Sequence, residues 1–187
     1  MSLEFEDIID DILDLVALDE KNKVIKILDL LPFGPCDIAR DAWRRLRLAV
    51  KANTAQPAPK EVPFALLGKL HRDRFVIEEI LQVATTRSDS RQCIYDLQDI
   101  VKIEKEAAKE GLMLVGVAHT HVDDSPAKPS QADRLAWLSI MFEFNRPLYY
   151  YVISASLEAG AYSIPVEVFL HLKESIRFLP VEMREDV

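Results

Sequence analysis

Two histidines, His119 and His121, stand one residue apart directly after an apolar run of the chain. On a β-strand, residues i and i+2 project to the same side, so both imidazoles would face one direction. Imidazole nitrogens combined with a carboxylate are a ligand set that zinc prefers. The pair predicts a metal site at a strand end. Two surface histidines at such an end are the alternative that these residues leave open.

The segment Ser130-Gln131-Ala132-Asp133 follows the histidines and is typical of a helix start. A serine N-cap with an acidic residue three positions later forms a capping box, in which each side chain bonds the backbone N–H of the other. A helix that starts just after the histidine strand directs its first turn back toward that strand. Asp133 is therefore a candidate third ligand. Three protein ligands leave one coordination position open, as in catalytic zinc sites.

One strand and one helix must position these residues. Leu112–Ala118 is apolar throughout and predicts a strand buried on both faces. A polar, proline-containing loop follows at 122–129, and Ser130 begins a helix that extends to about Phe144. The sequence thus predicts a strand, the two histidines, a loop and a helix in immediate succession.

The rest of the chain predicts strands and helices around one sheet. Two apolar runs joined by the polar turn His71–Arg74 predict a strand pair, and Gly111 is a natural helix stop. The predicted strands are 23–31, 62–70, 75–83, 148–156, 161–164 and 176–182, with a turn at 158–160. The predicted helices are 3–17, 37–52, 94–110 and 166–173, with a connector at 53–59 and a polar loop at 84–92. The expected buried face of the helix 94–110 consists of Ile94, Leu97, Val101 and Ala108. We interpret this mixture as a single α/β (α+β) domain.

Composition and charge narrow the functional classes. The formal net charge is −8, and residues 1–20 hold eight acidic residues and no lysine or arginine. The remaining 23 acidic residues balance the 23 bases of the chain, so no basic footprint for nucleic acid is present. No apolar run is long enough to cross a membrane and no signal peptide is recognisable, which predicts a cytoplasmic protein. The two cysteines, Cys36 and Cys93, form no CxxC motif, so neither a disulfide framework nor a cysteine-built zinc site is expected.

H-x-H followed by S-x-x-D resembles the signature of the JAMM metalloproteases, whose domain is also called MPN+. That family has a glutamate on an early strand, in a pattern like E-V-C-G-L-L-L-G. The segment Glu61-Val-Pro-Phe-Ala-Leu-Leu-Gly68 aligns with this pattern without a gap. The resemblance covers about residues 23–187 and leaves 1–22 as an acidic helical extension. It implies one JAMM/MPN-like domain with a mixed, mostly antiparallel sheet flanked by helices, layered as in cytidine deaminases.

The resemblance implies a role for each matching position. The metal ligands for one Zn²⁺ per chain are His119, His121 and Asp133. Glu61 acts as general base toward the zinc-bound water and then as acid toward the leaving amine, and Ser130 donates a hydrogen bond to the developing oxyanion. Zinc lowers the pKa of bound water to about 7, so a neighbouring carboxylate can take its proton at neutral pH. The implied enzyme is a zinc metalloprotease.

The resemblance also implies a substrate, namely the isopeptide or peptide bond after the C-terminal tail of ubiquitin or a ubiquitin-like protein. An extended tail can add as a strand beside the loop 84–92, where Arg87 and Arg91 are candidate substrate contacts. Partners expected from the resemblance are such conjugates, and a proteasome-like assembly or a second copy of the chain. No nucleic acid or membrane partner is expected.

Two departures from the family pattern leave alternatives open. Eight residues separate His121 from Ser130, where the family usually has seven, and Val122 replaces the usual proline. If the extra loop residue displaced Asp133, the domain would be an inactive MPN-type scaffold. The string His119-Thr120-His121-Val122-Asp123 also resembles H-x-H-x-D-H of metallo-β-lactamase-fold hydrolases, with Asp123 and His171 as metal ligands. In that reading Asp124 stands where a histidine is required.

Overall fold

The computed structural model describes residues 36–71, 74–90, 93–122, 127–144, 146, 148–163, 179–180 and 183–185. Several predictions lie outside these residues: the extension 1–22 with its helix 3–17, the strand 23–31 and the helix 166–173. Of the predicted strand 176–182, only a two-residue strand at Leu179–Pro180 is described.

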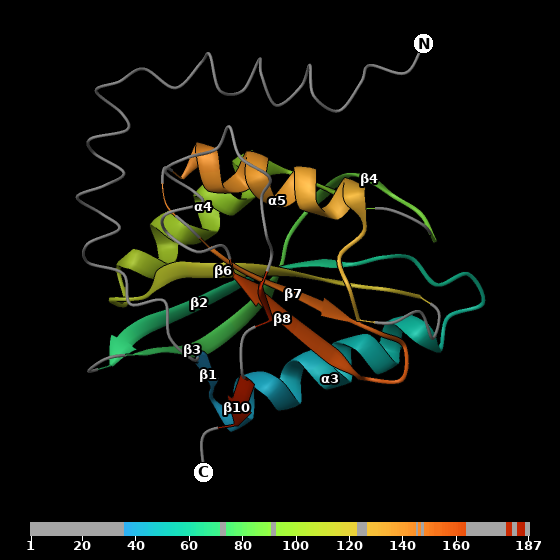
Figure 1. Cartoon of the computed structure of the whole chain (residues 1–187), viewed down its shortest axis with the longest axis horizontal. Helices are drawn as coiled ribbons and strands as arrows, with labels where there is room; N and C mark the ends of the chain where they lie inside the picture. Colours follow the sequence, from blue (N-terminus) through green and yellow to red (C-terminus); the bar gives the residue numbers. More distant parts are fainter. Residues whose placement is uncertain are drawn as a thin grey trace.

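One mixed sheet organises the described chain (Figure 1). Its strand order is β10-β1-β3-β2-β6-β7-β8-β9. Strand β6 pairs in parallel with β7, β1 pairs in parallel with both β3 and β10, and the other pairs are antiparallel. The strands are β1 (Cys36–Ile38), β2 (Pro63–His71), β3 (Arg74–Gln82), β6 (Met113–Thr120), β7 (Tyr149–Ile153), β8 (Ala159–Ser163), β9 (Leu179–Pro180) and β10 (Met183–Glu185). The structure confirms the α+β domain.

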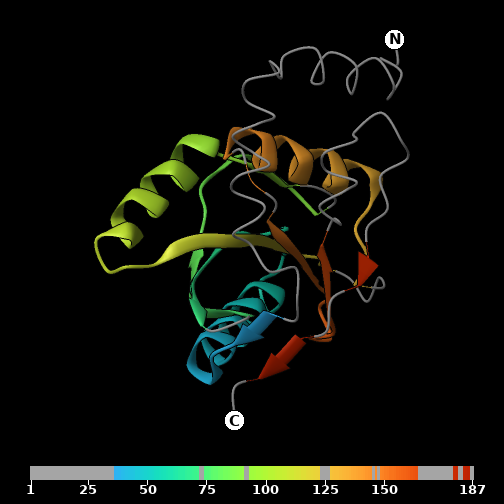
Figure 2. The ribbon, with the colours of Figure 1, turned by 60° about the vertical axis from the view of Figure 1, so that its left-hand side comes forward.

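Helices cover both faces of this sheet (Figures 1 and 2). Helix α3 (Arg40–Thr54) buries Ala42, Leu46 and Val50 on one face. Helices α4 (Leu97–Ala108) and α5 (Gln131–Glu143) lie on the opposite face. Sheet residues alternate between the two cores, as a period of two requires: Ala65 and Leu67 belong to the α4/α5 side and Phe64 and Leu66 to the α3 side. No helix of the described residues is long and apolar enough to cross a membrane.

Two helices begin later than predicted, because short strands precede them. Residues 37–38 belong to β1 rather than to the helix 37–52, since Cys36–Ile38 is buried and pairs with β3 and β10. The helix 94–110 likewise starts at Leu97, after β5 (Cys93–Tyr95). Asp96 caps it, because its side chain accepts hydrogen bonds from the N–H groups of Gln98 and Asp99.

This later start corrects the predicted face of α4. Ile94 lies on a strand with its side chain outward and is 47% exposed. The fully buried positions of the helix are Ile100 and Ala107, while Ala108 is exposed and Leu97 and Val101 are half-buried. The helix end is as predicted: Gly111 has φ of 73°, and Gly111 N and Leu112 N donate to Ala108 O and Ala107 O, a Schellman motif.

Two segments predicted as irregular contain strands. The polar loop 84–92 contains β4 (Thr85–Ser88), which pairs with β5 in a separate two-stranded sheet. The predicted turn 158–160 is also wrong, because Ala159 and Gly160 already belong to β8. The chain reverses earlier, where Leu157 has φ of 68° and its N–H donates to Ser154 O.

Gly68 closes the motif that begins at Glu61, and the structure gives a physical reason for it. It lies at a β-bulge of the β2–β3 pairing, and an added Cβ would stand 2.1 Å from the backbone oxygen of Val76. We expect Gly68→Ala to lower the free energy of unfolding by roughly 1–3 kcal/mol, as overpacking does. Urea unfolding measures this, with the adjacent exposed Lys69→Ala as control, which should stay within about 0.5 kcal/mol of the parent. Equal stability of the two variants would contradict the clash.

Candidate metal centre

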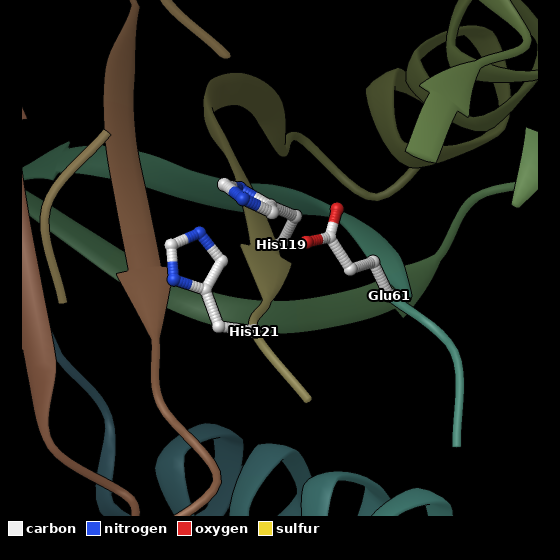
Figure 3. Close-up of side chains that lie close together, drawn as sticks. All are labelled: Glu61, His119 and His121. Carbon is white, nitrogen blue, oxygen red and sulfur yellow. The ribbon is translucent and has the colours of Figure 1, made fainter. Parts of the chain in front are cut away.

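The end of strand β6 places the two histidines at one end of the sheet, with His119 on the strand and His121 directly after it (Figure 3). His119 is 0% exposed and lies between Pro63 of β2 and Val152 of β7 in the pairing register. His121 follows the strand end, and its backbone N–H donates to Ile153 O at 2.8 Å, which continues the β6–β7 ladder by one step. The ring centroids are 4.9 Å apart. The prediction that residues two apart place both imidazoles in one site is confirmed.

Glu61 reaches the same site from the start of β2 (Figure 3). It is 6% exposed, and its donor atom and those of His119 and His121 all lie within 4.8 Å of one another. Its backbone is held by the β4 segment, which consists of strand β4 and the following Asp89. Glu61 N donates to Asp89 O at 2.9 Å, and Ser88 Oγ donates to Glu61 O at 2.7 Å. The structure thus brings Glu61 and the histidines together into a candidate metal site.

Asp133 enters the site from the first turn of α5. The predicted capping box is present: Ser130 Oγ accepts from Asp133 N at 3.2 Å, and Asp133 Oδ2 accepts from Ser130 N at 2.7 Å. This leaves Oδ1 facing His119 Nε2 at 3.3 Å, with His121 Nε2 3.8 Å from Oδ2. The same bonds that start the helix therefore fix the carboxylate against both imidazoles.

The donor set fits a zinc ion. Ligands about 2.0–2.1 Å from a tetrahedral centre stand about 3.3–3.4 Å from one another, and Asp133 Oδ1 and His119 Nε2 are 3.3 Å apart. His119 Nε2 is fully buried and, within the part of the chain that the structure describes, makes no hydrogen bond. A buried nitrogen of this kind is costly to leave without a partner, and a metal ion would satisfy it.

The electrostatics of the site keep these donors ready to bind a cation. Burial lowers the pKa of His119 to about 4, against the opposing effect of Asp133, so the imidazole is neutral at pH 7 and need not lose a proton to bind metal. Burial raises the pKa of Asp133, but its contacts with His121, His119 and Ser130 outweigh burial and hold that pKa well below its usual value. A neutral imidazole beside an ionised carboxylate is the protonation state that zinc requires.

Of the remaining predicted site residues, the structure describes Ser130 and Arg87. Ser130 is exposed at the helix start beside Asp133. Arg87 lies on β4 with its side chain 64% exposed and 3.6 Å from Asp89. Arg91, Asp123, Asp124 and His171 lie outside the described residues.

Sequence reasoning missed three residues that support the centre. Ser88 donates a hydrogen bond to the backbone oxygen of Glu61, and the Tyr150 hydroxyl contacts His119. Tyr95 donates a hydrogen bond to the backbone oxygen of Ala118, the residue before His119. The signal for Tyr150 is its place in the middle of the run Tyr149–Tyr151, because alternate strand residues face opposite cores. Nothing in the sequence related Ser88 or Tyr95 to the site.

Comparisons with known proteins agree with this geometry. The family model described as prokaryotic homologues of the JAB domain matches residues 41–180. The solution structure of a protein from Desulfitobacterium hafniense is similar with a TM-score of 0.57 and 18% identity, covering 81% of this chain and 94% of that one. The solution structure of a protein from Salinibacter ruber is similar with a TM-score of 0.51 and 17% identity, covering 80% and 91%. No curated protein matches the chain. At these identities the two solved structures show likeness of fold alone.

Proposed function

We propose that this chain, which belongs to the family of prokaryotic homologues of the JAB domain, is a zinc-dependent peptidase that cuts after the C-terminal tail of a ubiquitin-like protein. The strongest support is the convergence of His119, His121 and Asp133 from β6 and α5, with Asp133 Oδ1 3.3 Å from His119 Nε2. Glu61 completes the group from a third segment of the chain. Such a set of three ligands and one further carboxylate suits hydrolysis.

The proposed ligands are His119, His121 and Asp133. When bound, zinc supplies Lewis-acid polarisation of a carbonyl and brings the pKa of water near 7. Glu61 then serves as the proton carrier: its carboxylate accepts a proton from the attacking water and donates it to the leaving amine. Glu61 is 6% exposed, so few bulk waters can compete for the proton that it carries.

Ser130 is proposed to stabilise the oxyanion of the reaction. Its Oγ accepts the hydrogen bond from Asp133 N, so its own hydroxyl proton is left to donate to a substrate oxygen. The side chain is on an exposed residue at the start of α5, where a substrate carbonyl can approach. Fixed donors aimed at developing charge are worth about 10²–10³ in kcat.

We expect Ser130→Ala to lower kcat about 10²–10³-fold while zinc content stays unchanged. Loss of the cap should also lower the free energy of unfolding by about 1 kcal/mol. Steady-state cleavage kinetics, metal analysis and denaturant unfolding separate these effects. Ser139→Ala on the same helix is a control, because that hydroxyl donates to Leu135 O within the helix. A Ser130→Ala enzyme with the parent kcat would remove Ser130 from the mechanism.

The substrate tail is proposed to lie as an extended strand along the β4 segment. Strand β4 pairs with β5 through one of its edges, and a peptide can add to a strand edge through main-chain hydrogen bonds. The residues Ser88 and Asp89 that hold Glu61 belong to the same segment, so a bound tail would lie beside the general base. A diglycine tail suits a narrow passage over the proposed metal, because it has no side chains that could clash there.

Deleting residues 85–91 would remove the backbone hydrogen bonds of Glu61 as well as the proposed contacts with the substrate tail. Point variants of the two arginines test the tail contacts alone. We expect Arg87→Ala and Arg91→Ala to raise KM several-fold with kcat nearly unchanged, as loss of uniform substrate binding does. The control is Arg44→Ala, at an exposed position on α3, on the opposite face of the sheet. An unchanged KM in both variants would place the tail elsewhere.

The proposal as a whole is tested with ubiquitin-like fusion proteins and the purified chain, with and without a zinc chelator. We expect one zinc per chain and cleavage that is lost on chelation and restored by zinc. A chain that binds no zinc and cleaves no fusion would instead be an MPN-type scaffold. Assembly with a proteasome-like partner or with a second copy stays a prediction.

A further inference from the structure

Strand β8 holds the chain just before the start of α5. The backbone oxygen of Ala127 accepts a hydrogen bond from Tyr162 Oη at 2.6 Å. The same oxygen lies against Gly160, where an added Cβ would stand 2.1 Å from it and 2.8 Å from Tyr162 Oη. Gly160 and Tyr162 are two residues apart on β8 and therefore face the same side of the sheet. One backbone atom of the segment that leads into α5 is thus fixed by two positions of β8.

Gly160 also lies in the same row of the sheet as His119. In the pairing register, Gly160 of β8 is opposite Val152 of β7, and Val152 is opposite His119 of β6. Neighbouring strands are about 4.8 Å apart, so two steps across the sheet separate Gly160 from His119 by about 10 Å. The chain at Ala127 therefore passes close to the sheet two strands away from the first metal ligand.

A short segment joins this contact to the carboxylate of the candidate metal centre. Two residues separate Ala127 from Ser130, and one of them is the buried Pro129, whose ring fixes its φ angle. The capping box then ties Ser130 to Asp133 through two hydrogen bonds. A displacement of Ala127 is therefore passed on to Asp133, whose Oδ1 lies 3.3 Å from His119 Nε2.

We propose that Gly160 and Tyr162 are positioning residues, which hold Ala127 against β8 and thereby set the place of Asp133 beside the two imidazoles. The inference rests on the proposed function, because it assigns both residues to the zinc centre. It also accounts for the tolerance of one extra residue between the histidines and α5. A change of length before Ala127 leaves Asp133 in place, whereas a change after Ala127 moves it.

A matched pair of glycine variants separates positioning from stability. We expect Gly160→Ala to lower zinc affinity about 10–100-fold in competition with a chromophoric chelator, as loss of a group that orients a metal ligand does. Gly68→Ala is the control, because its Cβ would also stand 2.1 Å from a backbone oxygen, seven residues along the chain from Glu61. It should destabilise the fold and keep the parent affinity. Tyr162→Phe keeps the ring, removes the hydrogen bond and should lower affinity about 2–10-fold, which keeps the test valid if Gly160→Ala does not fold.

Two insertions of one glycine test the same contact through the length of the chain. An insertion between Asp124 and Ser125, which lie outside the described residues, precedes Ala127 and should keep the parent zinc affinity. An insertion between Lys128 and Pro129 follows Ala127 and should lower the affinity about 10–100-fold. Equal affinities of the two insertion variants would overturn the inference.

The contact is also measured without metal, by NMR on the metal-free full chain. Nuclear Overhauser effects should join the Tyr162 ring to Ala127 and the His119 ring to the β-protons of Asp133, and Gly160→Ala should lose the second of these contacts. A parent without the first contact, or a folded Gly160→Ala chain that keeps the second, overturns the inference. A parent that shows both contacts but binds no zinc would refute the proposed function alone.

Discussion

Replacing Asp133 with asparagine should remove zinc from the protein while leaving the fold intact. The amide oxygen can still accept from Ser130 N and so keep the start of α5, but the negative charge beside the two imidazoles is lost. We expect the zinc affinity to fall by more than about 100-fold, beyond the 10–100-fold that loss of an outer hydrogen-bond partner produces. Metal analysis after dialysis and chelator competition measure the effect, and cleavage should be lost with the metal.

The structure offers a matched control for this substitution. Asp99 occupies the same position in the first turn of α4, three residues after its N-cap, and also accepts a backbone hydrogen bond, from Ala84 N at 2.7 Å. Asp99→Asn should therefore keep full zinc content. If Asp133→Asn also kept it, Asp133 would be only a helix cap, and the ligands would be the histidines with Glu61.

Glu61→Gln should abolish most of the catalysis and keep the zinc. The amide is almost isosteric with the carboxylate, and the backbone contacts of Glu61 to Ser88 and Asp89 do not depend on its side chain. Because the proposed role is transfer of protons in both directions, we expect kcat to fall about 10²–10⁴-fold. Cleavage kinetics and metal content measured on the same preparation provide the test.

Glu143→Gln, an exposed glutamate at the end of α5, is the control and should leave both quantities unchanged. Two results would refute the assignment. Loss of zinc in Glu61→Gln would make Glu61 a metal ligand rather than the base, and parent kcat in that variant would exclude it from the chemistry.

The candidate metal-site residues could be predicted from the sequence, whereas the residues that contact them could not. His119, His121, Ser130 and Asp133 could be placed because strand parity and helix capping are local rules, and both hold here. Glu61 required the family pattern, since nothing local distinguishes it from a solvated strand residue. Membership of the JAB-domain family also decides against the metallo-β-lactamase alternative.

What could not be predicted depends on contacts between distant segments. Cys36–Ile38 is a strand because β3 and β10 flank it, and β4 is a strand because β5 pairs with it. The contact of Tyr150 with His119 depends on the register of the parallel β6–β7 pair, in which Val152 lies opposite His119. No periodicity within one segment carries that information.

The antiparallel pairing of β2 with β6 puts Glu61 and both histidines at one end of the sheet. Glu61 precedes the first residue of β2, and His71 ends that strand. Ten residues of extended chain at about 3.3 Å each separate the two by roughly 30 Å. The hairpin end near His71 is therefore a suitable place to attach a fluorophore, an affinity tag or an inserted peptide, and such additions should leave turnover at the opposite end untouched.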